Sequence, residues 1–583
     1  MSRVFPQFLL VVCLAMMVAV PVANAADDAE PSPEQLKFFE QEVRPLLVEH
    51  CSKCHSEEKQ SGGLRLDSIG ALLGGGDSGP AIVAGKPGES LLIEAINWES
   101  YEMPPSGKLD DEAIEILTRW VEMGAPWPGG DRTAMVRSEA PKITDEDRAF
   151  WSFRPLTVPE TPAVAAAKWG QNDIDAFILR KLDEQGLKPA PRADRATLVR
   201  RLYEAVTGLP PTPEQVEAFV YDESPDAYEK LVDELLASER YGEHLARFWL
   251  DLVRYAESDG WRQDAYRPHA WRYRDYVIRS FNADKPYDRF VQEQLAGDEI
   301  APEDPEALAA TGYYRHGIYE YNQRDAITQW SDMLNDITDT TGDVFLGLGM
   351  GCARCHDHKF DPILQKDYFR LQAFFANIWM RDDIPIATPE EIAEYQRQLA
   401  VWEEQTADIR AQLEELERPK REALARTAIG RFTEDIQAIM AKPEEERTAY
   451  ETQIADLVLR QVVDSYGRLE SRFKGEEKEK RDALKKELAA FDAIKPAPLP
   501  KGRTATDVGA SAPVVYIPGK ERLGEVEPGF LSVFEEAPAE ILPPGELSTT
   551  GRRTTLARWL TRPDHPLTTR VITNRIWQQL FGT

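Results

Sequence analysis

Four of the five cysteines lie in two copies of one five-residue pattern, Cys51-Ser-Lys-Cys54-His55 and Cys352-Ala-Arg-Cys355-His356. C-x-x-C-H is the attachment pattern of c-type haem, in which both thiols add to vinyl groups and the histidine binds the iron. A lone C-x-x-C also occurs in zinc and thioredoxin-like sites. Here a histidine follows both pairs although the chain has only eight, and a zinc site built from the four cysteines would leave both histidines unexplained. The sequence therefore predicts two covalent haem groups, attached at Cys51, Cys54, Cys352 and Cys355 and bound through the iron ligands His55 and His356.

The elements around the first motif suit a small helical cytochrome domain over residues 30–130. Residues 33–49 are predicted to form a helix that begins after Ser32 and leads into the motif, and Asp110 can cap a second helix over 111–123. Between them, Met103 precedes two prolines, which favour an extended loop. We predict Met103 as the sixth iron ligand; its alternative role is core packing.

No Met-Pro-Pro loop follows the second motif, so its distal ligand stays open. His358 lies too close along the chain to reach the opposite face of the iron that His356 would bind. His358, Asp357 and Asp361 are candidate catalytic acid–base groups near that iron, or they brace the loop. The distal position is either vacant or occupied by one of five residues: His244, His269, His316, Met333 and Met350.

Export is predicted from residues 1–25. Arg3, an apolar run from Phe8 to Val20 and the Ala23-Asn24-Ala25 cleavage site form a signal peptide, so the mature protein is expected in the periplasm or otherwise outside the cytoplasm. Later segments lack a run long enough to span a membrane. The net charge of −31 argues against a nucleic-acid partner and suits a basic redox partner or plain solubility.

The rest of the chain divides by composition. A linker over 131–170 precedes a larger helical domain over 171–385 that carries the second motif, with helices expected at 173–185, 195–206, 213–221 and 225–238 and no strand. Residues 386–495, rich in Glu, Lys, Arg and Leu, predict a helical hairpin or short coiled coil. Residues 496–583 form a short β-containing segment, with Val514–Ile517 as the best strand, paired near 523–526. The fold class is mostly α.

Longer motifs resemble the planctomycete-type cytochrome c (PSCyt) multidomain family. Residues 51–66, 85–87, 103–105 and 120–125 resemble its cytochrome domain. Residues 151–155, 173–177, 200–213, 241–256, 294–298 and 351–363 resemble its first associated domain of unknown function, and 556–560 with 574–582 the start of a second. Similar proteins often have a histidine where this chain has Phe248, and they continue beyond Thr583, so the resemblance implies a chain truncated at its C-terminus.

Three functions fit these features. The first is an exported di-haem cytochrome that transfers electrons to a redox partner protein, as the redox module of a larger oxidoreductase. The second is a haem-dependent oxidoreductase acting on carbohydrate, with its active site at the second haem or in the missing C-terminal part; the sugar substrate rests on family analogy. The third is a non-redox zinc or structural scaffold.

Overall fold

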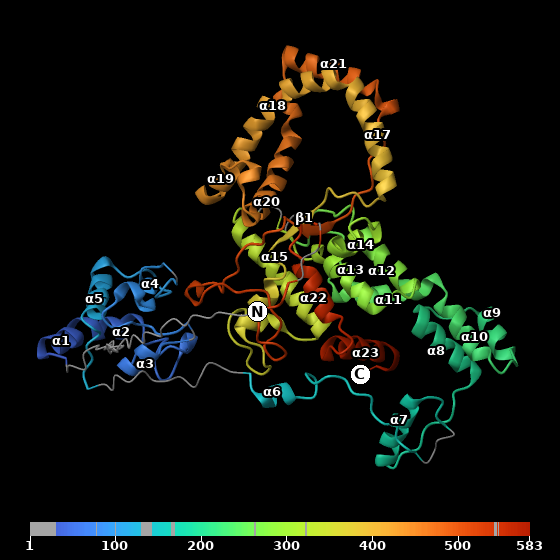
Figure 1. Ribbon diagram of the computed structural model, residues 1–583, viewed down its shortest axis with the longest axis horizontal. Coiled ribbons are helices and arrows are strands. Elements are labelled where there is room, and N and C mark those ends of the chain that lie inside the picture. Colours follow the sequence, from blue (N-terminus) through green and yellow to red (C-terminus); the bar gives the residue numbers. More distant parts are fainter. Residues whose placement is uncertain are drawn as a thin grey trace, which may run out of the picture. The chain divides into compact units, whose positions relative to one another are not determined.

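The computed structural model describes residues 31–76, 78–99, 101–129, 143–164, 169–261, 264–320, 323–541, 545 and 547–582. The fold is mostly helical, as predicted, and contacts divide the chain into two units, residues 1–140 and 141–583 (Figure 1). The predicted signal peptide lies outside the described residues. Among the residues that the structure describes, no helix is both long enough and apolar enough to cross a bilayer.

The described residues of the first unit form five short α-helices: α1 (Pro33–Phe38), α2 (Arg44–His50), α3 (Ile69–Gly74), α4 (Leu91–Ile96) and α5 (Asp111–Glu122). A π-helical turn, Phe39–Val43, joins α1 to α2, so the predicted helix before the first motif is continuous. Both predicted caps are confirmed. The Ser32 hydroxyl accepts a bond from the Gln35 N–H (3.2 Å), and the Asp110 carboxylate accepts one from the Ala113 N–H (2.8 Å).

Three buried aromatic side chains pack within the otherwise aliphatic core of this unit. The rings of Phe39 and Trp127 lie 4.4 Å apart, and the buried Trp120 indole donates to the Pro126 carbonyl at 3.0 Å. Since Phe39 lies in the turn between α1 and α2 and Trp120 lies on α5, this packing fixes the helix before the first motif against the last helix of the unit.

The second unit begins with helices in the predicted places. Its helices up to the second motif and just beyond are α6 (Asp145–Ala149), α7 (Asp173–Glu184), α8 (Arg195–Thr207), α9 (Pro213–Tyr221), α10 (Ala227–Leu236), α11 (Glu239–Leu252), α12 (Trp271–Asn282), α13 (Tyr287–Ile300), α14 (Pro305–Ala310), α15 (Ala326–Thr341) and α16 (Gln365–Gln372). The four helices predicted between 173 and 238 correspond to α7, α8, α9 and α10 within a few residues.

A helical arm follows in the region predicted as a hairpin, and Figure 1 shows it in orange: α17 (Pro389–Gln405), α18 (Ala407–Ile429), α19 (Glu434–Ala441), α20 (Ala449–Ser465) and α21 (Gly475–Ala489). Ion pairs Lys420–Glu477 and Arg481–Glu417, both 2.7 Å, join α18 to α21. Because the higher-numbered residue of one helix meets the lower-numbered residue of the other, α18 and α21 are antiparallel, although α19 and α20 lie between them in the chain.

The sheet corrects two expectations. Strands β1 (Ile378–Arg381) and β2 (Thr504–Asp507) pair antiparallel, with Ile378 opposite Asp507, so a strand does occur within 171–385. The predicted strand Val514–Ile517 is wrong: it forms no strand, and one backbone bond, from Val526 to Val515 (2.8 Å), links it to its expected partner. Pro513 and Pro518 flank this segment, and proline lacks the N–H that would extend a ladder.

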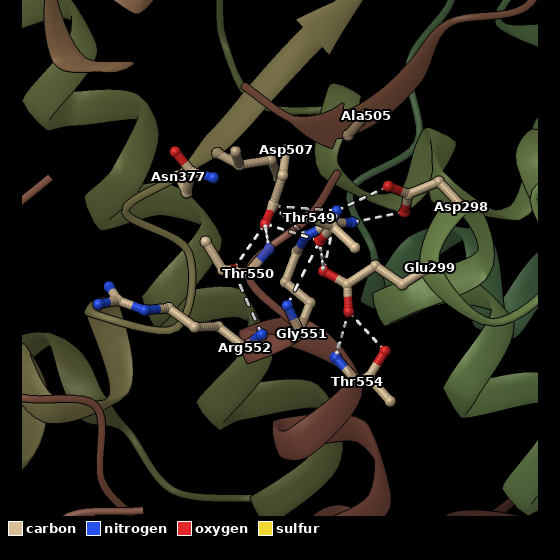
Figure 2. A network of polar contacts seen from close by, with 12 residues as sticks. Asp298, Glu299, Asn377, Ala505, Asp507, Thr549, Thr550, Gly551, Arg552 and Thr554 are labelled. Atoms are coloured by element: carbon tan, nitrogen blue, oxygen red, sulfur yellow. Dashed lines mark hydrogen bonds and ion pairs between the residues drawn. The ribbon is translucent and has the colours of Figure 1, made fainter. Parts of the chain in front are cut away.

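The core of the second unit extends from Phe153 to Leu567 and includes side chains of α20, β2 and α22 (Arg552–Leu560). Helix α23 (Pro566–Phe581) ends the described chain. Figure 2 shows carboxylates of α13 and β2 converging on the start of α22. The guanidinium of the fully buried Arg553 lies 2.6 Å from Asp298, 3.1 Å from Asp507 and 3.3 Å from Glu299. This network ties three segments that are far apart in sequence into one core.

Candidate functional site

The first C-x-x-C-H motif lies directly after α2. The N–H groups of Cys54 and His55 both donate to the Cys51 carbonyl at 3.1 Å, which turns the chain and brings the three side chains together. The following loop returns to the motif, since the Ser61 N–H donates to the Cys54 carbonyl and the Leu66 N–H donates to the His55 carbonyl, both at 2.9 Å.

A cavity of about 280 Å³ opens beside this motif. Cys51, Cys54 and His55 line it, and so does Met103, which is distant in sequence. The remaining walls are mainly aliphatic: Leu64, Leu66, Ala81, Leu91, Leu92, Ala95 and Ile96. The structure thus brings together the four residues predicted around the first haem.

The loop that carries Met103 is fixed by bonds on both sides of the side chain. The Met103 N–H donates to the Ala95 carbonyl on α4, and the Trp98 indole donates to the Met103 carbonyl, both at 3.2 Å. Sequence reasoning missed α4 as a wall of the cavity. Its run Leu91-Leu92-Ile93-Glu94-Ala95-Ile96 was the available signal, because such an apolar run needs burial.

The second motif has different surroundings. It lies on a tight 3₁₀ turn, Met350–Arg354, and Cys352, Cys355 and His356 are all exposed. The two motifs therefore share their residue types but differ in burial, since Cys51, Cys54 and His55 are half-buried around a cavity.

The three candidate acid–base residues after this motif make local contacts. The Asp357 carboxylate accepts a bond from the Gln365 N–H (2.7 Å). The His358 ring accepts one from the Asp361 N–H (2.8 Å), and its Nδ1 lies 3.3 Å from the Asp361 carboxylate. These contacts are those of groups that brace the loop.

The five candidate distal ligands of the second haem take part in packing or line other cavities. Buried His316 packs against the rings of Tyr255 and Tyr273, 5.2 and 4.6 Å away. His244 meets the ring of Phe248 edge-on at 5.2 Å. The remaining three are a core side chain, Met350, and two residues that line small cavities, His269 and Met333.

Three family models match the chain. The planctomycete cytochrome C model (PSCyt1) matches residues 51–107, a protein of unknown function (DUF1549, PSCyt2) matches 173–379, and a second protein of unknown function (DUF1553, PSD1) matches 552–583. The chain belongs to the planctomycete-type cytochrome c multidomain family. Searches of curated proteins and of solved structures gave no match.

Membership of this family implies covalently bound haem c, and the cavity in the cytochrome domain fits that group. Its walls are mainly apolar, as a porphyrin requires, and both cysteines, His55 and Met103, the groups that haem c would engage, lie on it. The His55 Nδ1 atom is buried without a hydrogen-bond partner among the described residues. Burial also raises the pKa of the Cys51 thiol to about 11.

The matched segment 552–583 of this planctomycete-type cytochrome packs with the matched segment 173–379. Leu556, Trp559 and Leu560 of α22 belong to the same core as Trp249 and Phe290. Together with the Arg553 network, this packing makes the two matched segments parts of one folded unit.

Proposed function

We propose that this protein is an exported di-haem c-type cytochrome that transfers electrons to or from a redox partner protein, as the redox module of a larger oxidoreductase. The observation that carries the proposal is the convergence of Cys51, Cys54, His55 and Met103 on one apolar cavity. Nothing in a zinc or structural scaffold would require a thioether and an aliphatic cavity beside a C-x-x-C-H motif.

Four residues of the cavity would then have distinct roles. Cys51 and Cys54 would hold the haem through thioether bonds, and His55 and Met103 would bind the iron. Haem c supplies reversible one-electron transfer at its iron, and a thioether ligand raises the potential relative to a second histidine. The aliphatic walls from α4 and the loop after the motif exclude water and so favour the less charged ferrous state.

The second haem would be attached at Cys352 and Cys355, with His356 as its iron ligand. Exposure of all three side chains leaves them accessible to a porphyrin and leaves its edge open to a redox partner. The alternative function, oxidation of a carbohydrate at this haem, would require free acid–base groups. Because Asp357 and His358 accept bonds from loop N–H groups, electron transfer is the better supported of the two functions.

Haem stoichiometry in the exported protein tests the proposal. Pyridine haemochrome spectra should give two haems per chain, and the Cys51→Ala/Cys54→Ala and Cys352→Ala/Cys355→Ala variants should each keep one. Lys53→Ala, within the first motif, is the matched control and should keep both. Zinc without haem would overturn the proposal, and one haem lost only with Cys51 and Cys54 would reduce it to a mono-haem cytochrome.

A further inference from the structure

A cluster of arginines surrounds a small cavity in the second unit, away from both cysteine motifs in sequence. Arg267, Arg315, Arg460 and Arg503 all line this cavity, which measures about 30 Å³. Ile318 on its wall is 68 % exposed, so the cavity reaches the surface. Four cations at one small cavity are unusual in a chain whose net charge is −31.

Three of the four arginines are neutralised by carboxylates close by. The pairs are Arg267 with Asp259 (2.6 Å), Arg315 with Asp382 (2.9 Å) and Arg460 with Asp456 (3.1 Å). The carboxylate on the cavity wall, Asp336, is engaged by Arg254. The local carboxylates are therefore all committed to other arginines.

Arg503 is the exception. Its side chain makes no hydrogen bond or ion pair with any residue that the structure describes, and its Nε atom is buried. Burial and then the guanidinium groups of Arg315, Arg267 and Arg460 lower its pKa to about 9, an effect that Asp382 only partly offsets. The side chain as a whole is half-buried, and a partly buried guanidinium without a counter-ion favours a ligand that supplies the missing negative charge.

Further unpaired polar groups lie beside Arg503. The Tyr319 hydroxyl is buried without a partner in the part of the chain that the structure describes, and Tyr319 lines the same cavity. Arg503 also lines a smaller neighbouring cavity with His316, whose ring nitrogens both lack partners among the described residues although the side chain is only 6 % exposed. Buried polar groups are normally paired, so an unpaired cation, hydroxyl and imidazole together indicate that a ligand completes the site.

We propose that this cavity binds an oxyanion group, a carboxylate, sulfate or phosphate, with Arg503 as its ion-pair partner and the Tyr319 hydroxyl as a second donor. A cavity of about 30 Å³ has room for roughly two water molecules, which suits an oxyanion group and excludes a whole sugar or nucleotide. The rest of such a ligand lies outside, beyond Ile318. This site is independent of haem attachment.

Titration of the purified holoprotein with sodium sulfate, phosphate and acetate at constant ionic strength, followed by calorimetry, tests the proposal. Sulfate and phosphate are tetrahedral and acetate is planar, so the three titrations compare the two shapes. At least one of the three anions should bind saturably, which general stabilisation by salt does not produce. Arg503→Gln should weaken that binding about tenfold or more, because it removes a charged hydrogen-bond donor. Tyr319→Phe should weaken it about fivefold, because it removes a neutral donor. Arg426→Gln, on the exposed face of α18, is the matched control and should bind like the wild type.

Equal binding by the wild type and the Arg503→Gln variant would overturn the proposal. The absence of saturable binding for all three anions would also overturn it and would mean that water fills the cavity. Haem content and the unfolding midpoint establish that each variant is folded. If Arg503→Gln does not fold, Tyr319→Phe decides, because it removes one hydroxyl and keeps the ring: unchanged binding by that variant would contradict the proposed donor set.

Discussion

Two motifs with the same residue types differ most in the burial of their thiols. Cys51 is half-buried and its pKa is raised to about 11 by burial, whereas Cys352 and Cys355 are exposed. Since the thiolate is the reactive form of cysteine, a thiol with a raised pKa is a poor nucleophile inside the folded cavity. We therefore expect haem to be attached at Cys51 before the cavity closes, while the second motif stays reactive in the folded unit.

Met103 is the residue whose assignment is most directly testable. Met103→Ala should abolish the weak sulfur-to-iron band near the red end of the oxidised spectrum and lower the potential of the first haem, because a thioether favours ferrous iron. Met123→Ala is the control, since Met123 ends α5 and does not line the cavity. A Met103→Ala variant that keeps both properties would make Met103 a core side chain.

His358 offers a test of the second motif. Because its ring accepts a bond from the Asp361 N–H, His358→Ala should leave haem content intact and cost about 1 kcal/mol of local stability. If the distal side is open, the reduced wild-type protein should bind CO rapidly at this haem. The His358→Ala variant should bind CO at a different rate, because its loop is less well held. Lys359→Ala is the neighbouring control. A sharp low-spin spectrum without any CO response would indicate a strong sixth ligand instead.

At the scale of elements, the sequence predicted helices well and strands poorly. Helical periodicity and the caps Ser32 and Asp110 are local signals, so α5 and α7 to α10 could be located from them. Strand β2 has the polar sequence Thr-Ala-Thr-Asp, and its burial depends on distant partners: the Thr311 hydroxyl accepts from the Ala505 N–H, and Asp507 meets Arg553. No local pattern could show that.

The residues of the haem cavity could be predicted from the sequence, whereas those of the arginine cavity could not. Residue type and spacing identify Cys51, Cys54, His55 and Met103, and the structure brings these four residues to one cavity. The arginine cavity was not predictable, because its four cations come from positions 267, 315, 460 and 503 and only the tertiary fold unites them. Sequence also could not show that Arg503, unlike its neighbours, would pair with no carboxylate among the described residues.

The start of α23 gives a pH prediction for one element. The His565 ring accepts a bond from the Thr568 N–H (3.2 Å) and packs edge-on against Trp559 at 4.4 Å. Burial, then Arg562, lowers the pKa of His565 to about 4. Its folded-state pKa lies below the unfolded value of about 6.5, so the unfolded state binds more protons between these values, and stability falls as pH falls through this window by up to about 3 kcal/mol.

His565→Asn keeps an acceptor for the cap but removes the titrating ring. The variant should be less stable at pH 7, because packing against Trp559 is lost, yet it should lose less further stability than the wild type between pH 6.5 and 4.5. Urea unfolding followed by tryptophan fluorescence at several pH values measures this difference. Parallel pH profiles for the two proteins would contradict the assignment.

At the scale of the whole molecule, the second unit depends on buried charge as well as on apolar packing. Arg553, Glu299 and Asp507 are almost completely buried, and Thr549 and Thr554 donate to the Glu299 carboxylate. Three carboxylates surround one guanidinium, so the cluster carries excess negative charge. Burial raises the pKa values of Asp298 and Glu299 although Arg553 opposes the shift. The stability of the contact between the matched segments 173–379 and 552–583 therefore depends on the positive charge of Arg553.

Arg553→Met should be strongly destabilising, by about 3–5 kcal/mol near neutral pH, because it leaves three buried carboxylates without their cation. Loss of the cation raises the pKa values of Asp298 and Glu299 further and removes the charge that holds the pKa of Asp507 low. The folded state of the variant then binds more protons than the unfolded state above pH 4, and stability falls as pH rises. The variant should therefore lose more stability at pH 8 than at pH 5.5.

Arg552→Met is the matched control: its guanidinium donates to the Ala373 carbonyl at 2.9 Å, so its loss should cost about 1 kcal/mol with little pH dependence. Urea unfolding of the wild type and both variants at the two pH values, six combinations in all, gives the comparison. Equal losses for Arg553→Met at both pH values would show that the network does not depend on carboxylate charge.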